Sequence, residues 1–274
     1  MTRRLSSVPS STRGVTLAVE AAGPRDAPTV VLLHGFPLSG AMWDPQLASL
    51  GRDWRLLAPD ARGVGASDLG DGQTTLEMLV EDLFSLLDAL APGPVVGCGL
   101  SMGGYVLLRA LEREPERFRG VVLCDTRSEA DGDAERLSRA DAIRRLREQG
   151  VPAFTDRFLS SVLAPGTRER DPALVGRLRR MICSNSPAGL RGLLLAMAMR
   201  TDTTPSLSRI AVPTLVLAGS EDALTPPEGA RALAARRPGA RFEEIPGAGH
   251  LSNVEAPGAF DRALSDFLAS CDAG

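Results

Sequence analysis

A serine flanked by glycines is the first feature of this chain that could do chemistry. Ser101 is the centre of residues 99–103, Gly-Leu-Ser-Met-Gly, which follow a short apolar run at 94–99 and precede a helical pattern at 104–114. A G-x-S-x-G sequence between a strand and a helix is typical of a nucleophile elbow, a tight turn that presents the serine hydroxyl at the edge of a sheet. We therefore predict that Ser101 is a nucleophile. The alternative is a glycine-rich loop with a surface serine.

A serine hydroxyl needs a base within hydrogen-bonding distance, and the chain contains two histidines. His34 follows an apolar run in the first part of the chain, and His250 lies on a glycine-rich turn after a late one. With this type of motif the order along the chain is Ser, then Asp or Glu, then His. Because only His250 follows Ser101, we predict that His250 is the base, with a packing or capping role as the alternative. His34 is then expected to shape its own loop.

The acid that orients the histidine should end another strand between the serine and the base. Asp222 follows a clearly apolar run and is the preferred candidate, with Asp125 and Glu221 as the alternatives. Its role would be to fix the imidazole tautomer and to stabilise the imidazolium. Asp60 also follows a strand-like run, but it precedes the serine and is expected to hold its own loop.

An acyl-transfer reaction also needs hydrogen-bond donors for the oxygen that becomes negatively charged. One donor is expected to be the backbone N–H of Met102, the residue after the nucleophile. The second is expected from the loop that follows His34, as the backbone N–H of Phe36. These two amides would form the oxyanion hole.

To bring these residues together, the chain must alternate strands with helices. Short apolar runs, most of them rich in valine and leucine, are expected to be strands buried on both faces. They occupy residues 29–33, 55–58, 95–98, 120–124, 213–218 and 241–245. Helical patterns occupy residues 75–90, a segment from Ser101 to near Pro115, and residues 257–269. The alternation predicts an α/β fold with a mostly parallel sheet and helices on both faces.

The alternation stops after Asp125. Residues 127–209 are charged and helical in pattern and contain no convincing strand. We therefore predict one core, 1–126 and 210–274, interrupted by a helical insertion at 127–209. A separate second domain is not expected, because neither flank could complete a sheet alone.

The composition argues against several classes of partner. Arginine supplies all the positive charge, and a net charge of −3 with a pI near 5.6 argues against binding nucleic acid. Four cysteines without CxxC or Cys/His pairing predict neither a disulfide framework nor a metal site, and no cofactor is expected. We find no signal sequence and no apolar segment near the ~20 residues that cross a bilayer. A cytoplasmic protein without a membrane partner is expected, and the sequence carries no signal for oligomeric state.

The order and spacing of these motifs resemble the α/β-hydrolase superfamily over residues 14–270. The matching segments are 34–37, 60–67, 99–104, 219–226 and 249–250. The resemblance implies an eight-stranded sheet and a helical cap at 127–209 that covers the site and excludes water. Serine at the elbow separates the chain from the haloalkane dehalogenases and epoxide hydrolases of the superfamily, which carry aspartate there.

Residues 99–104 and 123–127 are similar to those of 3-oxoadipate enol-lactonases and related small-ester hydrolases. The resemblance implies hydrolysis of a small carboxylic ester or lactone through an acyl-serine intermediate. The same residues could serve C–C bond hydrolysis, perhydrolysis or amide cleavage, and a non-catalytic binding protein on this fold is a further alternative. Because an enol-lactonase binds a carboxylate, the resemblance suggests Arg180, Arg191 or Arg200 as its partner.

Overall fold

One eight-stranded sheet forms the centre of the computed structural model, which describes residues 4–11 and 14–272. The strands are β1 (Arg4–Pro9), β2 (Thr16–Ala22), β3 (Thr29–Leu33), β4 (Arg55–Pro59), β5 (Val95–Leu100), β6 (Phe118–Cys124), β7 (Thr214–Gly219) and β8 (Arg241–Ile245). Their order across the sheet is β1-β2-β4-β3-β5-β6-β7-β8. β2 is antiparallel to both β1 and β4, and every other neighbouring pair is parallel.

The six strands expected from apolar runs are all present, with bounds that differ by at most two residues at either end. The mostly parallel α/β sheet predicted from their alternation is therefore confirmed. β1 and β2 were not recognised as strands from their own residues. They form an antiparallel pair at one edge of the sheet, and the exposed or half-buried positions along them interrupt the apolar pattern that marks the central strands.

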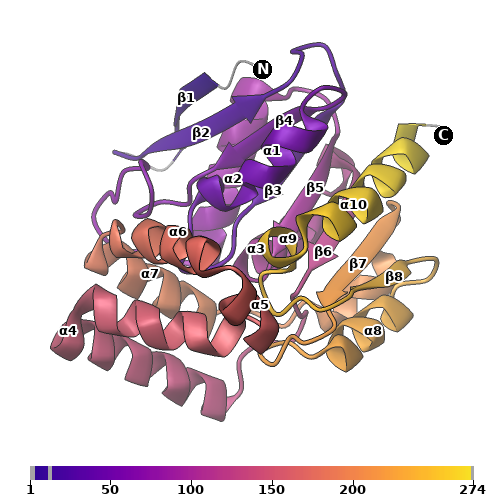
Figure 1. Cartoon of the computed structure of the whole chain (residues 1–274). Helices are drawn as coiled ribbons and strands as arrows, with labels where there is room; N and C mark the ends of the chain where they lie inside the picture. The colour runs from indigo at the N-terminus through magenta and orange to yellow at the C-terminus, as the bar shows by residue number, and fades with distance from the viewer. Residues whose placement is uncertain (1–3, 12–13, 273–274) are drawn as a thin grey trace.

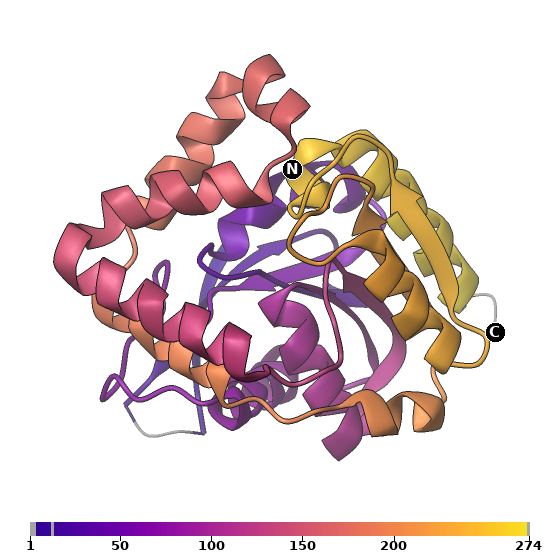
Figure 2. The ribbon, with the colours of Figure 1, turned by 90° about the horizontal axis from the view of Figure 1, so that it is seen from below.

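Helices cover both faces of the sheet, as expected (Figures 1 and 2). α1 (Asp44–Leu50) and α10 (Pro257–Asp272) pack together on one face, and α2 (Leu76–Leu90) and α3 (Met102–Arg113) pack together on the other. α8 (Pro227–Arg236) lies against β7 and β8, and the short α9 (Ser252–Glu255) precedes α10. The 3-10 helices η1 (Gly40–Trp43) and η2 (Pro115–Arg117) lie in the core, and η3 (Thr204–Arg209) lies between α7 and β7, at the end of the segment 127–209.

Between β6 and β7 the chain forms a helical insertion without a strand, as predicted. Its helices are α4 (Asp133–Val162), α5 (Pro165–Arg170), α6 (Pro172–Cys183) and α7 (Pro187–Ala198). α4 is interrupted at Gly150, whose φ of +78° lies outside the helical region. α4 packs against both α6 and α7, and Figure 1 shows this helical layer below the sheet.

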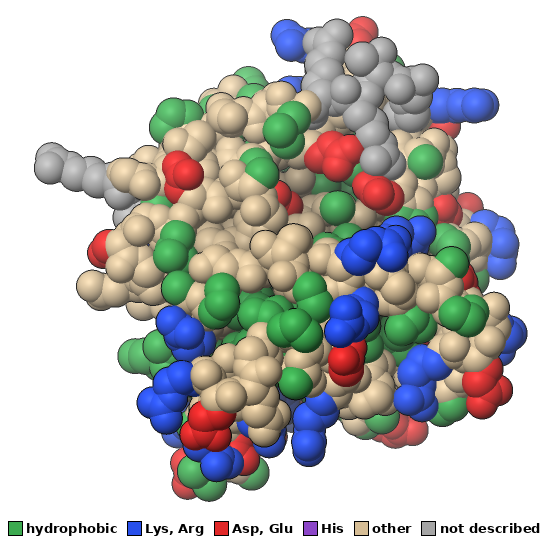
Figure 3. All heavy atoms as spheres, turned by 60° about the vertical axis from the view of Figure 1, so that its left-hand side comes forward, with side chains coloured by type: hydrophobic (Ala, Val, Ile, Leu, Met, Phe, Trp, Pro, Cys, Tyr) green, Lys and Arg blue, Asp and Glu red, His purple; other side chains and the backbone are tan. Residues whose placement is uncertain are grey.

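The core consists mainly of leucine, valine and alanine, together with a few large aromatic side chains such as Trp43 and Phe260. A buried ion pair lies among these side chains: Arg62 donates to both carboxylate oxygens of Asp82. On the face shown in Figure 3, arginine and acidic side chains are interspersed with small apolar patches. Within residues 4–11 and 14–272, no helix combines the length and apolar character needed to cross a membrane.

Replacement of a glycine by alanine should have opposite effects on stability at Gly103 of α3, which packs against the sheet, and at Gly229 of α8, which is exposed. A Cβ at Gly103 would lie 2.2 Å from the carbonyl oxygen of Leu33, so Gly103→Ala should lower the free energy of unfolding by about 3 kcal/mol. Gly229, in the exposed surface of α8, has no atom within 4 Å of such a Cβ, so Gly229→Ala should raise it by about 0.5 kcal/mol. Urea denaturation of both variants measures the difference, and equal stabilities would contradict the packing described.

Candidate active site

Ser101 lies in the turn between β5 and α3, with φ 52° and ψ −111°. A non-glycine residue adopts such a conformation only where its surroundings hold it. The Ser101 N–H donates to the Cys124 carbonyl over 2.9 Å, and the Thr126 hydroxyl donates to the Ser101 carbonyl over 2.8 Å. The glycines of the elbow are required by contact, since a Cβ at Gly99 would lie 2.5 Å from the Gly103 carbonyl oxygen. The end of β6 therefore holds the serine in its strained turn.

His250 is the base candidate that the fold brings to this serine. Its Nε2 lies 2.9 Å from Ser101 Oγ, and the ring is 1% exposed. The His250 N–H donates to the carbonyl of Val162, at the end of α4, over 2.8 Å. Glu255 accepts from the N–H groups of Leu251 and Ala164 through its two carboxylate oxygens. The histidine loop is thus held by the helical insertion as well as by the core.

Asp222, in the loop after β7, completes the series: its Oδ2 lies 2.8 Å from His250 Nδ1. The Thr225 hydroxyl donates to the same oxygen over 2.6 Å. The other oxygen accepts the N–H groups of Leu224 and Thr225. Burial acts to raise the pKa of Asp222, but the charge of His250 and these hydrogen bonds outweigh it and lower the pKa. The carboxylate is therefore stabilised in its ionised form.

His250 has a raised pKa in this setting. Burial acts to lower it, but the charge and hydrogen bond of Asp222 outweigh that effect, and the charge of Asp125 adds to them. The imidazole is therefore a stronger base than a free histidine.

The alternative acid, Asp125, has different partners. One of its oxygens accepts the Gly219 N–H over 2.7 Å, and the other accepts the Ser252 hydroxyl over 2.5 Å. Burial, followed by the charge of Asp222, raises its pKa to about 7. Asp125 thus joins the ends of β6 and β7 to the start of α9, while Asp222 contacts the imidazole.

The other acids and the second histidine considered from the sequence lie away from the imidazole. Glu221 is exposed. Asp60 accepts the N–H groups of Gly40 and Ala66, within and beside its own loop. His34 is buried, and its Nε2 accepts the Ala61 N–H over 2.9 Å, so it joins two loops of the core. Burial lowers its pKa, which suits the neutral ring that this contact needs.

The two expected oxyanion donors lie beside Ser101 in different elements. Met102 is the first residue of α3, and the first amides of a helix have no carbonyl partner within it. Phe36 follows His34 and Gly35 at the end of β3, lies next to a cis peptide bond to Pro37, and lines the same cavity as the serine.

Ser101 and His250 open into a cavity of about 320 Å³ between the core and the insertion. Its wall is mainly apolar, and one end is polar. The apolar side chains are Phe36, Tyr105, Ala142, Phe154, Phe158, Val162, Leu194, Met197 and Leu224. The polar end includes Arg127, Glu135, Ser138 and Arg139. A small substrate with an apolar body fits such a site.

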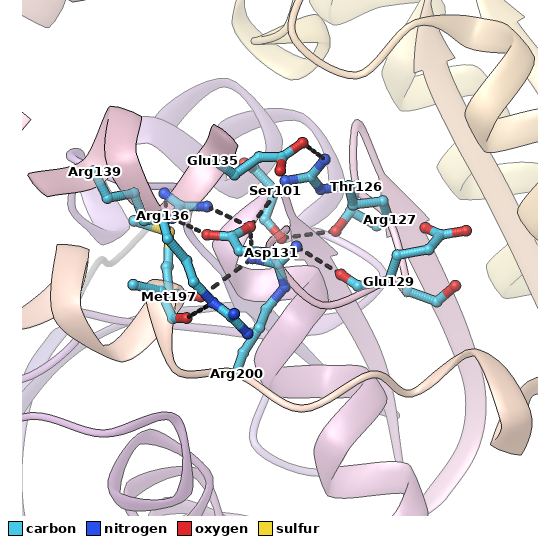
Figure 4. Close-up of polar contacts among 12 residues, drawn as sticks. Ser101, Thr126, Arg127, Glu129, Asp131, Glu135, Arg136, Arg139, Met197 and Arg200 are labelled. Carbon is cyan, nitrogen blue, oxygen red and sulfur yellow. Dashed lines mark hydrogen bonds and ion pairs between the residues drawn. The ribbon is translucent and has the colours of Figure 1, made fainter. Parts of the chain in front are cut away.

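Three arginines converge on one buried carboxylate next to this polar end (Figure 4). Arg127, Arg139 and Arg200 all donate to Asp131, and Arg200 also lies over the ring of Tyr105 at 4.1 Å. Burial acts to raise the pKa of Asp131, but the hydrogen bonds and charges of Arg139 and Arg200 outweigh it and lower the pKa.

The arginines suggested from the resemblance are not those that line the cavity. Arg200 is buried against Asp131, Arg180 is exposed and Arg191 is half-buried, and none of the three is among the lining residues. Arg127 and Arg139 line it instead. Arg139 lies in an arginine-rich helical pattern that offers no signal to single it out. Arg127 lies in the loop after β6, within the segment 123–127 that resembles the enol-lactonases, and that position was the signal that could have found it.

The described residues hold no cluster of three His, Cys, Asp or Glu side chains arranged to bind a metal ion. All four cysteines lie within the described part of the chain, and none of them is in a disulfide.

Comparison with known proteins places this geometry in a family. Residues 28–257 match the family model described as the alpha/beta hydrolase fold. The chain is 30% identical over 242 residues to 3-oxoadipate enol-lactonase 2 of Acinetobacter baylyi, which covers 88% of this chain and 89% of that protein.

Solved structures agree in both sequence and shape. A thermophilic esterase from Thermogutta terrifontis is 34% identical and superposes with a TM-score of 0.93 over 98% of this chain and 99% of that one. The enol-lactonase from Burkholderia xenovorans LB400 is 30% identical, with a TM-score of 0.88 over 97% and 100%. The family model matches most of the chain, and the Ser101–His250–Asp222 arrangement lies on the sheet that it describes. The chain therefore belongs to the alpha/beta hydrolase family.

Proposed function

We propose that this protein hydrolyses small carboxylic esters or lactones through an acyl-serine intermediate. The observation that supports it most directly is the unbroken series of contacts from Ser101 Oγ to His250 and from His250 to Asp222, at 2.9 and 2.8 Å. Relatives described as an enol-lactonase and an esterase, similar over nearly the whole chain, support the same class of substrate. The cavity of about 320 Å³ suits a small acyl group.

In the proposed first step, Ser101 Oγ attacks the acyl carbon while His250 Nε2 takes the hydroxyl proton. The carbonyl oxygen becomes an oxyanion, for which the N–H groups of Phe36 and Met102 are the proposed donors. Asp222 stabilises the imidazolium and remains ionised. The adduct collapses, and His250 returns its proton to the departing alkoxide, which leaves as the alcohol.

In the second step, water attacks the acyl-serine ester, and His250 takes one of its protons. A second oxyanion forms and collapses, the proton passes to Ser101 Oγ, and the carboxylic acid leaves. With a lactone, the alcohol and the acid are two ends of one product molecule.

We also propose that the core consists of residues 1–126 and 210–274, and that residues 127–209 act as a cap. Phe154, Phe158 and Leu194 of α4 and α7 line the cavity over Ser101, which supports a role in excluding water and shaping the pocket. The absence of a disulfide at the four cysteines, all within the described residues, is compatible with the cytoplasmic location that we propose.

The nucleophile assignment is tested by Ser101→Ala. Hydrolysis of p-nitrophenyl butyrate should fall by about 10⁶-fold in kcat, because no other group can form the acyl-enzyme. Ser160→Ala, which changes an exposed serine of α4, is the matched control and should retain the wild-type rate. Substantial activity of Ser101→Ala would remove this serine from the mechanism.

The two candidate acids are distinguished by Asp222→Asn and Asp125→Asn. Asp222→Asn should reduce kcat by about 10⁴-fold, because the amide no longer supports the required tautomer and charge. Asp125→Asn should keep most of the rate, since the amide can still accept from Gly219 and meet the Ser252 hydroxyl. The reverse ranking in steady-state kinetics would assign the acid to Asp125.

The pH dependence of kcat/KM should reflect the raised pKa of His250. The base acts only when neutral, so activity should fall as pH decreases through that pKa, with a midpoint above the ordinary value of 6.5. Asp125→Asn should move the midpoint to lower pH, because the Asp125 charge raises the pKa of His250. A midpoint unchanged by Asp125→Asn in a pH series from 5 to 9 would contradict this coupling.

A further inference from the structure

Asn185 is a buried side chain of the insertion that bonds to two loops of the core. It lies between α6 and α7 and is 4% exposed. Its Nδ2 donates to the Pro37 carbonyl over 2.8 Å, and its Oδ1 accepts the Gly65 N–H over 2.8 Å. The insertion is therefore bonded to the residue that follows Phe36, the second proposed oxyanion donor.

These two contacts fix which way the amide points. If the side chain were flipped, its oxygen would face the Pro37 carbonyl and its NH₂ would face the Gly65 N–H, so both contacts would become repulsive. A side chain with one donor and one acceptor is needed here. Neither alanine, which has no polar group, nor an ionised aspartate, which has no donor, can make both contacts.

The two core loops that Asn185 joins, residues 34–40 and 60–67, are already bonded to each other. The ring of His34 and the carboxylate of Asp60 each accept an N–H from the opposite loop. Asn185, which belongs to the insertion, forms one hydrogen bond to each of these two loops. The proposed oxyanion loop thus has partners in the core and in the insertion at the same time.

Three further contacts show that the insertion packs closely against the core at this point. The ring of Phe36 meets the rings of Phe154 and Phe158 edge-on, at centroid distances of 6.0 and 6.2 Å. At the start of α7 the backbone approaches the 60–67 loop so closely that a Cβ on Gly189 would lie 1.8 Å from the Gly63 carbonyl oxygen. The side chain of Phe36 and the carbonyl of the next residue are therefore both held by the insertion.

We propose that Asn185 is a positioning residue for the oxyanion hole, a role that rests on the proposed function of Ser101 and Phe36. By holding the Pro37 carbonyl, it keeps the loop in the place where the Phe36 N–H meets the developing negative charge. Such donors act only when they are held in position before the reaction, and a displacement of about 1 Å can reduce the rate by about 100-fold. Asn185 is not among the residues that line the cavity, so substrate binding should be little affected.

The test compares Asn185→Ala and Asn185→Asp with a matched control, Ser186→Ala, in the same loop between α6 and α7. Ser186→Ala removes the hydroxyl that caps α7 and accepts from Ala188 and Gly189, without touching the oxyanion loop. Both Asn185 variants should lower kcat for p-nitrophenyl butyrate by about 10- to 100-fold with little change in KM. Ser186→Ala should lower the melting temperature and leave kcat unchanged.

A second measurement does not depend on turnover. Amide hydrogen exchange followed by mass spectrometry should be faster for residues 34–42 in both Asn185 variants than in the wild type or Ser186→Ala. Unchanged exchange in this segment, or an equal fall of kcat in all three variants, would overturn the proposal. If the wild type turned over no ester or lactone, the proposed function would fail, and the exchange measurement would still decide whether Asn185 holds this loop.

Discussion

The strained backbone of Ser101 is the constraint on which the site depends. Its φ of 52° and ψ of −111° point the side chain away from the sheet and towards the imidazole, and the peptide is held there by Cys124 and Thr126 at the end of β6. The parallel pair β5–β6 at the centre of the sheet therefore carries the nucleophile. The glycines of the turn have no room for a side chain, because the backbone of Gly103 packs against Leu33 at the end of β3 and also against Gly99.

The loops after β6, β7 and β8 are far apart in the sequence but lie together at the carboxyl ends of these strands. Asp125 joins the ends of β6 and β7 to α9 and contributes a carboxyl whose pKa of about 7 reflects its burial and the charge of Asp222. Asp222 is held by Thr225 and by backbone amides, which leaves one oxygen directed at His250. Two buried carboxyl groups thus stand beside one histidine with different partners and opposite pKa shifts.

The helical insertion contacts the backbone of the site as well as the space above it. The Val162 carbonyl accepts the His250 N–H, and Glu255 bonds both to the histidine loop and to Ala164 of the insertion. Asn185 makes the corresponding contact with the loop of Phe36. The insertion therefore reaches both sides of Ser101 through directed hydrogen bonds, and its placement is coupled to the geometry of the reacting groups.

The sequence by itself determined the features that depend on short-range sterics. The turn of Ser101 needs glycines at fixed offsets, the buried strands need continuous apolar runs, and His250 is the only histidine after the serine. Only the tertiary structure placed Asp222 rather than Asp125 against the imidazole of His250, placed Arg127 rather than Arg200 in the cavity wall, and added the edge strands β1 and β2. These outcomes depend on sheet register and on contacts between residues far apart in the chain, and no local pattern encodes such contacts.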